Sequence, residues 1–209
     1  MLRKTRCMTL AFIPAVLTLA ACGDDGGPAQ GLGPGEQLDI AFGETFTGDL
    51  QIPGGQVVVE SGGAVRGNVD VSEFGGFLVR PGATIQGNIV ATSGGRVSVE
   101  DARLEGNVEA GGGAVVRLDE TELTGNLTAD EASDVDVIGG SVVRGNVEIE
   151  DGDGAVLRSS VFGGSVRVER CDLVEIVDNT IDGGLTVRDN PACSLSGNQV
   201  SGEETIEGC

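Results

Sequence analysis

The chain of 209 residues contains 36 glycines and no Trp, Tyr or His, and its formal net charge is −20. This length predicts one domain with its own core, and the acidic balance excludes a nucleic-acid-binding protein, which needs a basic surface. Without histidine the chain has no imidazole for catalysis, and without Trp or Tyr it lacks the usual platforms on which bases or sugars stack.

Residues 1–22 have the pattern of a secretory leader. Arg3, Lys4 and Arg6 give the leader a basic start, and an apolar run from Leu10 to Leu19 follows. A helix that spans a bilayer needs about 20 apolar residues, so this run is too short for a transmembrane segment. The leader predicts that the chain is exported.

The end of the leader, Leu19-Ala20-Ala21-Cys22, resembles a bacterial lipobox. The resemblance implies that residues 1–21 are a lipoprotein signal peptide and that the Cys22 thiol carries a palmitate-type membrane anchor. The alternative is an ordinary signal peptide with a chance cysteine. The first acidic residue, Asp24, comes one step later than in lipoproteins kept at the inner membrane, which favours the outer membrane of the cell envelope.

Residues 22–37 are dominated by glycine, proline and polar residues. Such a composition buries too little apolar surface to offset the entropy lost on ordering. We therefore expect a flexible tether over 22–37 and a folded domain over 38–209.

One pattern recurs from residue 46 onward: an apolar residue, any residue, Gly, Asn and a second apolar residue, as in Val65-Arg66-Gly67-Asn68-Val69. Its marker glycines follow one another at steps of 19 or 20 residues. They are Gly48, Gly67, Gly87, Gly106, Gly125, Gly145, Gly164, Gly183 and Gly202. A repeat of this kind predicts stacked units that bury a shared core.

Apolar and polar residues alternate within each unit. Over residues 65–71 this alternation predicts one half-buried strand. A second short strand is predicted in most units, at 57–59, 77–79, 97–99, 115–118 and 135–137. Glycine and acidic clusters between the strands are typical of turns, and no segment has a helical period of helix length.

Two short strands and their turns in 19 residues are too little for a propeller blade, and the leucine spacing does not fit leucine-rich repeats. The sequence therefore predicts an all-β fold, a single-stranded parallel β-helix (solenoid) of about eight coils of 19 to 20 residues. The drift between 19 and 20 residues favours a right-handed coil over the left-handed hexapeptide type, which keeps a strict period.

Three columns of apolar side chains are expected to point into this solenoid. The first is Val65, Ile85, Leu104, Leu123, Val143, Phe162, Ile181 and Val200. The second is Leu50, Val69, Ile89, Val108, Leu127, Val147, Val166 and Leu185. The third is Ile52, Val71, Ala91, Ala110, Ala129, Ile149, Val168 and Val187.

Five asparagines share one place in the repeat: Asn68, Asn88, Asn107, Asn126 and Asn146. Asparagine tolerates the backbone angles of a bend, and stacked side-chain amides can bond along the axis of a solenoid. We expect a structural ladder, and the alternative is a ladder that binds a ligand or an ion.

The Gly-Asn-Val, Gly-Asn-Ile and Gly-Asn-Leu bends, and the stretch 61–69 in particular, resemble bactofilins, which are bacterial polymer-forming proteins with a right-handed parallel β-helix. The resemblance covers roughly residues 46–150 and implies the fold. The chain departs from it in two respects, because its coils are slightly longer and its leader exports it, whereas bactofilins are usually cytoplasmic. Two kinds of protein partner stay open, a second copy of the chain and another envelope protein.

Cys171, Cys193 and Cys209 remain when the leader cysteines Cys7 and Cys22 are set aside. An exported chain meets an oxidising compartment, where disulfides form. Cys193 and Cys209 are 16 residues apart, less than one coil, so a disulfide between them would close the last coil. The rival pairing is Cys171 with Cys193.

Acidic clusters raise the question of Ca²⁺, which prefers oxygen ligands. The best candidates are Asp151 and Asp153 in the stretch Asp151-Gly152-Asp153-Gly154, but the motif of calcium-binding repeats does not recur. The sequence predicts no firm metal site and no cofactor.

Many right-handed β-helices are polysaccharide lyases or hydrolases, and Asp134 with Asp136 offers a pair of carboxylates for acid–base work. The short turns and the acidic surface disfavour this enzyme hypothesis. The sequence instead predicts a non-catalytic, lipid-anchored envelope protein that acts as a scaffold, spacer or interaction surface. A Ca²⁺-dependent adhesion or carbohydrate-binding module is the other alternative.

Overall fold

The computed structural model describes residues 30–209, and every helix or strand element in that range is a β-strand. Three strands form one coil, and each strand pairs in parallel with its equivalents in the neighbouring coils. The strands form three parallel sheets that run the length of a solenoid. The all-β parallel solenoid that the repeat predicts is therefore confirmed.

The first sheet has ten strands: β1 (Gln30–Gly31), β4 (Leu50–Pro53), β7 (Val69–Ser72), β10 (Ile89–Ala91), β13 (Val108–Gly111), β16 (Leu127–Asp130), β19 (Val147–Glu150), β22 (Val166–Glu169), β25 (Leu185–Arg188) and β28 (Glu204–Glu207). The second sheet has nine: β2 (Gln37–Ile40), β5 (Gln56–Val59), β8 (Gly76–Val79), β11 (Arg96–Glu100), β14 (Val115–Asp119), β17 (Asp134–Ile138), β20 (Gly154–Arg158), β23 (Leu173–Val177) and β26 (Cys193–Ser196). The third sheet also has nine: β3 (Thr45–Thr47), β6 (Ala64–Arg66), β9 (Thr84–Gln86), β12 (Arg103–Glu105), β15 (Glu122–Leu123), β18 (Val142–Val143), β21 (Val161–Phe162), β24 (Thr180–Ile181) and β27 (Gln199–Val200).

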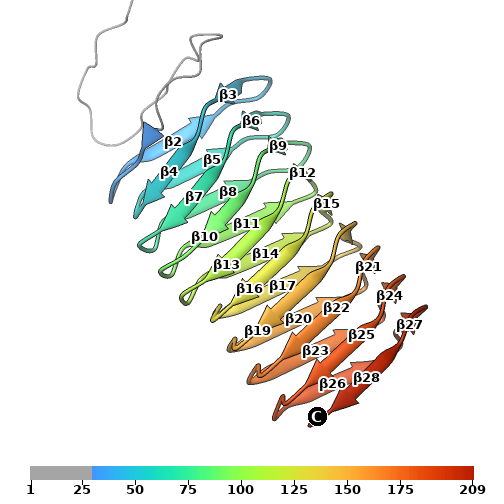
Figure 1. The fold of residues 1–209 in the computed structure, drawn as a ribbon. Coiled ribbons are helices and arrows are strands. Elements are labelled where there is room, and N and C mark those ends of the chain that lie inside the picture. Colours follow the sequence, from blue (N-terminus) through green and yellow to red (C-terminus); the bar gives the residue numbers. More distant parts are fainter. Residues whose placement is uncertain (1–29) are drawn as a thin grey trace, which may run out of the picture.

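Coil one comprises β1 to β3, and each later coil takes the next three strands in chain order. Figure 1 shows the coils stacked from β2 near the blue end of the chain to β27 and β28 at the red end. The structure thus has nine coils, one more than the sequence predicts. The additional coil comes from residues before the first clear copy of the repeat.

The three predicted inward columns are confirmed by the strand register. In the third sheet Leu104 pairs with Ile85 on one side and with Leu123 on the other. In the first sheet Val108 lies between Ile89 and Leu127 in the same way. All of these side chains are buried. The core is therefore a set of apolar columns that run along the axis and that no single coil could bury alone.

The stretch 65–71, predicted as one strand, is two strands with a corner between them. β6 ends at Arg66 in the third sheet, and β7 begins at Val69 in the first. At this corner a Cβ on Gly67 would lie 2.0 Å from the carbonyl oxygen of Gly48, so only glycine lets the two coils approach. Periodicity missed the corner because the inward and outward alternation continues across it.

Gln30, the first described residue, already belongs to the solenoid, so the domain predicted over 38–209 extends at least to residue 30. The Gln30 N–H donates to the Asp49 carbonyl at 3.0 Å, and the Leu32 N–H donates to the Gln51 carbonyl at 2.8 Å. Leu32 is also buried in the core. The second half of the expected tether is therefore the start of coil one, because a neighbouring coil supplies the hydrogen bonds that its composition does not predict.

The predicted signal peptide over 1–21 and the lipidation residue Cys22 lie outside the described residues. Among residues 30–209 there is no helix with the length and apolar character that crossing a membrane requires. The right-handed sense of the coil stays a prediction.

Candidate functional site

A polar ladder runs along the corner between the third and first sheets. Each member accepts, through its side-chain oxygen, a hydrogen bond from the backbone N–H of the equivalent residue one coil further on. Asn88 Oδ1 accepts from the Asn107 N–H at 2.9 Å, and Asn107 Oδ1 accepts from the Asn126 N–H at 2.9 Å. The whole ladder is Asp49, Asn68, Asn88, Asn107, Asn126, Asn146 and Ser165.

The five predicted asparagines therefore have a structural role, because each accepts a backbone hydrogen bond from the next coil. The N–H groups at the corner lie between two sheets, and the side-chain oxygens supply the partner that a backbone donor needs. Asp49 and Ser165 continue the ladder at either end with a carboxylate and a hydroxyl. The asparagine pattern does not predict these two residues, because the corner requires only a side-chain oxygen that reaches the N–H of the next coil.

Replacing Asn107 by leucine should lower the free energy of unfolding by about 1 kcal/mol, because the Asn126 N–H then loses its acceptor. Asn107→Asp keeps a side-chain oxygen and is the matched control, expected to cost much less. Urea unfolding followed by circular dichroism measures both variants. Equal losses in the two would mean that the ladder hydrogen bond contributes nothing to stability.

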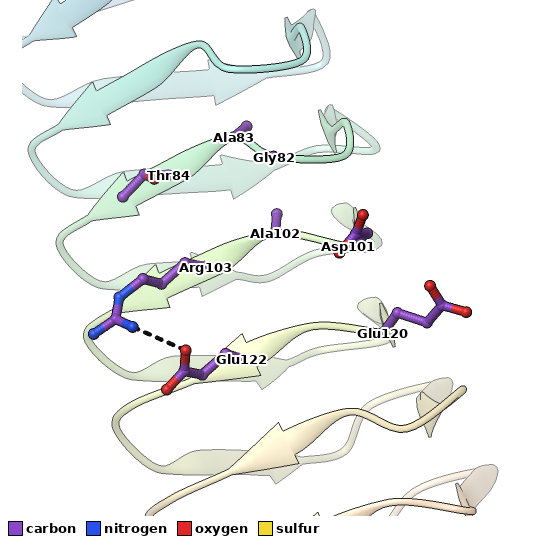
Figure 2. A pocket seen from close by; sticks show the side chains of 8 residues that line it. All are labelled: Gly82, Ala83, Thr84, Asp101, Ala102, Arg103, Glu120 and Glu122. Atoms are coloured by element: carbon purple, nitrogen blue, oxygen red, sulfur yellow. Dashed lines mark hydrogen bonds and ion pairs between the residues drawn. The ribbon is translucent and has the colours of Figure 1, made fainter.

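A shallow depression of about 290 Å³ lies beside β9, β12 and β15 of the third sheet. It is lined by Gly82, Ala83, Thr84, Asp101, Ala102, Arg103, Glu120 and Glu122. Figure 2 shows Arg103 and Glu122 joined at one end of it, while Asp101 and Glu120 lie at the other. The hollow is shallow and open to solvent, and the Arg103–Glu122 ion pair occupies one end of it, so it does not enclose a ligand.

Glu122 is held between two arginines. Its carboxylate lies 2.8 Å from Arg103 Nη1 and 2.5 Å from Arg144 Nη2. The hydrogen bond from Arg144, together with the charges of both guanidinium groups, lowers the pKa of Glu122. Hydrogen bonds from Arg103 and Gln86 likewise lower the pKa of Glu105. Carboxylates kept ionised in this way suit ion pairing between coils and are poor general acids.

Arg144→Gln should raise the pKa of Glu122 toward its ordinary value of 4.5, because the largest stabilisation of the carboxylate is then lost. In the unchanged protein this group stabilises the fold above pH 4.5, and that contribution disappears as the pH falls through the lowered pKa of the folded state. An NMR titration of the Glu122 side-chain carboxyl in both proteins measures the shift. An unchanged pKa would show that the Arg144 contact is absent in solution.

The carboxylate pair of the enzyme hypothesis, Asp134 and Asp136, lies on the outer face of β17. Burial raises the pKa of Asp136, the charge of Asp134 raises it further, and Arg117 opposes both from 3.5 Å. The two side chains are neighbours on one strand of a nine-stranded sheet. Asp136 is held by Arg117, so the pair is part of the ion-pair network on the outer face of the second sheet.

Asp151, one of the two candidate calcium ligands, is paired with Arg170. Arg170 Nε lies 2.7 Å from Asp151 Oδ1, and Arg170 Nη2 lies 2.8 Å from Oδ2. The hydrogen bonds from Arg170 lower the pKa of Asp151. Within residues 30–209 no group of three or more Asp, Glu, His or Cys side chains is arranged to hold a metal ion.

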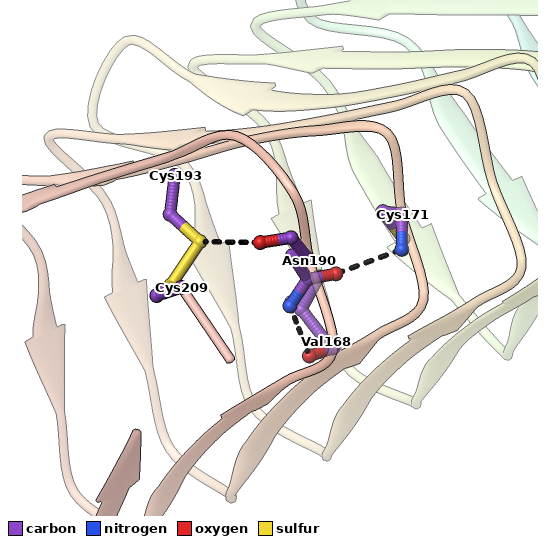
Figure 3. Close-up of a disulfide and its surroundings, with 5 residues drawn as sticks. All are labelled: Val168, Cys171, Asn190, Cys193 and Cys209. Carbon is purple, nitrogen blue, oxygen red and sulfur yellow. Dashed lines mark hydrogen bonds between the residues drawn. A yellow bond between two sulfur atoms is a disulfide. The ribbon is translucent and has the colours of Figure 1, made fainter. Parts of the chain in front are cut away.

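Cys193 and Cys209 are joined by a disulfide, with their Cα atoms 5.5 Å apart (Figure 3). The structure thus contains this pairing and not the rival pairing of Cys171 with Cys193. Cys171 is buried and free, and its backbone N–H donates to Asn190 Oδ1 at 2.7 Å. Burial raises the pKa of the Cys171 thiol, which keeps it protonated and unreactive. The disulfide ties the end of the chain across the last coil.

No protein-family model, curated protein or solved structure matches this chain. The resemblance to bactofilins therefore extends as far as the parallel β-solenoid of repeats that the structure contains.

Proposed function

We propose that the chain is a non-catalytic, lipid-anchored protein of the bacterial cell envelope, whose solenoid acts as a scaffold, spacer or interaction surface. The observation that carries the proposal is the unbroken stacking of nine coils around one continuous core. At a strand spacing of about 4.8 Å such a stack is a rod roughly 40 Å long. A rod with three regular outer faces separates or presents partners, and it needs no active-site cleft to do so.

Contacts between coils make this rod stiff. The corner ladder joins each coil to the next through side-chain oxygens. Ion pairs cross the coils on the outer faces, for example Arg103 with Glu122 and Arg158 with Glu175. The disulfide holds the final coil at the end where no further coil covers the core. Stiffness of this kind supports a role as spacer or platform.

The anchor is supported by the leader and by the short distance along the chain from Cys22 to the first described strand. Cys22 lies eight residues before Gln30, the first residue of β1. Eight residues span at most about 27 Å when extended, so a lipid on Cys22 would hold the N-terminal end of the rod close to the membrane. The acidic surface keeps the remainder soluble and away from anionic lipid.

The full chain expressed in a Gram-negative bacterium and its Cys22→Ser variant test this proposal. The unchanged chain should fractionate with the outer membrane and should accumulate as a longer precursor when lipoprotein signal peptidase is inhibited by globomycin. Cys22→Ser should lose both properties, and Cys7→Ser, a change in the same leader, should keep them. If Cys22→Ser fractionates like the unchanged chain, the lipid anchor is refuted.

A further inference from the structure

Phe42 and Phe74 are 81% and 79% exposed, the highest fractions among the large apolar side chains of residues 30–209. Both lie at corners that border the second sheet, Phe42 after β2 and Phe74 before β8. Each ring lies over a glycine of a later coil, because a Cβ on Gly62 would meet Phe42 at 3.0 Å and a Cβ on Gly94 would meet Phe74 at 2.6 Å. Two aromatic rings are thus displayed on the outside of the same end of the rod.

Phe74 adopts a backbone conformation that suits glycine. Its φ is +64°, and the register of β5, β8 and β11 places it level with Gly54 and Gly94, whose φ values are +79° and +76°. A residue with a side chain is strained in this region. Glycine occupies the equivalent corner position in the two neighbouring coils, whereas Phe74 places an exposed aromatic ring there.

Apolar side chains also occupy the sheet face between the two corners. Val58 and Leu78 are paired neighbours at outward positions of β5 and β8, where Leu78 is half-buried and Val58 is only 6% exposed. Together with Phe42 and Phe74 they form what we call the apolar band, across the second sheet in coils one to three.

Unpaired positive charge lies beside the apolar band. The arginines that form ion pairs lie in coil four and beyond: Arg103, Arg117, Arg144, Arg158, Arg167, Arg170 and Arg188. Arg66, Arg80 and Arg96 form no ion pair within residues 30–209. Arg96 opens β11 next to Gly76, and Arg80 directly follows β8. The register of the second sheet places Arg80 level with Glu60 and Glu100, but neither carboxylate forms an ion pair with it. Exposed rings and arginines without an ion pair therefore occur together, at the N-terminal end of the rod.

We infer that the apolar band is a membrane contact, in which Phe42 and Phe74 enter the interface of a phospholipid bilayer and Arg80 and Arg96 bind lipid phosphates. Aromatic side chains favour that interface, and guanidinium groups bind phosphate oxygens strongly. The inference rests on the proposed lipid anchor, because Cys22 would keep this end of the rod beside the bilayer. A tethered contact needs little intrinsic affinity, since the tether supplies a high effective concentration.

The absence of Trp and Tyr from the chain gives a direct test by fluorescence. Phe74→Trp introduces the only tryptophan into the lipidated full chain, which is then reconstituted in phosphatidylcholine vesicles with or without brominated acyl chains. Its emission should fall about twofold with the brominated lipid, because an interfacial ring meets the upper acyl chain. The control is Leu173→Trp, which replaces an exposed apolar residue of the second sheet in coil eight and should be unaffected.

The outcomes separate this inference from the proposed function. If the chain does not float with the vesicles, the lipid anchor itself fails. If it floats but Phe74→Trp is not quenched, or Leu173→Trp is quenched equally, the anchor stands and the band is not the contact.

A second variant guards against an effect of the mutation on folding. Phe74→Gly removes the strained conformation, so its melting temperature should be equal to or above that of the unchanged protein. In the double variant Phe42→Trp with Phe74→Gly, quenching by brominated lipid should weaken relative to Phe42→Trp alone. A lower melting temperature in Phe74→Gly would show that the ring serves the fold, and the inference would be overturned.

Discussion

Replacing Phe162 by alanine is expected to lower the free energy of unfolding by about 4 kcal/mol, the largest effect of any single substitution considered for this solenoid. Phe162 is completely buried and pairs with Val143 on one side and Ile181 on the other. The main-chain hydrogen bonds of the sheets fix the spacing of the coils. The neighbouring side chains therefore cannot collapse into the cavity, and the free energy of unfolding falls by the full cost of that cavity.

The loss should also be local, because the stability of a solenoid is close to a sum over coils and their contacts. Amide hydrogen exchange should rise most in coils six to eight and least in coils two and three. Val161→Ala is the control, since Val161 is the preceding residue of β21 but is 39% exposed, and it should change stability by less than about 0.5 kcal/mol. Denaturant unfolding followed by circular dichroism compares the two. Similar losses would contradict an inward Phe162.

Gly106→Ala is expected to cost about 3 kcal/mol, although it adds only one methyl group. A Cβ at this position would lie 2.2 Å from the Gly87 carbonyl oxygen and 2.6 Å from the Gly87 carbonyl carbon. Both atoms belong to the main chain of the preceding coil, so the clash is relieved only if the coils move apart. Such a movement would also stretch the hydrogen bond from the Asn107 N–H to Asn88.

Gly76→Ala is the matched control for Gly106→Ala. Its Cβ would meet only the Cγ atom of Gln56, at an ordinary contact distance of 3.7 Å. Gly76 lies in β8, where a side chain should be neutral or slightly stabilising. Thermal unfolding of the two variants in parallel distinguishes close approach of the coils from a general intolerance of alanine. If both variants melt at the temperature of the unchanged protein, Gly106 does not pack against the main chain of Gly87 in the preceding coil.

The sequence was sufficient to predict the inward columns because the repeat fixes the register. Because Leu104 and Leu123 are one coil apart, the position of every residue between them relative to the neighbouring coils is determined. The Cys193–Cys209 pair was predictable for a related reason, since a separation shorter than one coil places both cysteines at the same end of the solenoid. These features follow from periodicity alone.

Other features depend on contacts that periodicity does not encode. The corner at Gly67 divides an alternating stretch between two sheets, and the pattern of apolar residues is the same with or without it. The inclusion of residues 30–37 in the solenoid depends on hydrogen bonds to the following coil, although glycine and proline are frequent there. The exposure of Phe74 could not be predicted, because nothing in the sequence indicates that this phenylalanine adopts a left-handed backbone conformation at a corner.

The most direct test of the account is the pattern of NMR contacts between backbone protons of neighbouring strands. A parallel solenoid predicts contacts between residues 19 or 20 positions apart in ascending order, so that Val108 meets Leu127 and Ala110 meets Ala129. The same step should recur in each sheet along the rod. Contacts in descending order, in which Val108 meets Ala129 while Ala110 meets Leu127, would mean antiparallel strands and would contradict the solenoid and every proposal built on it.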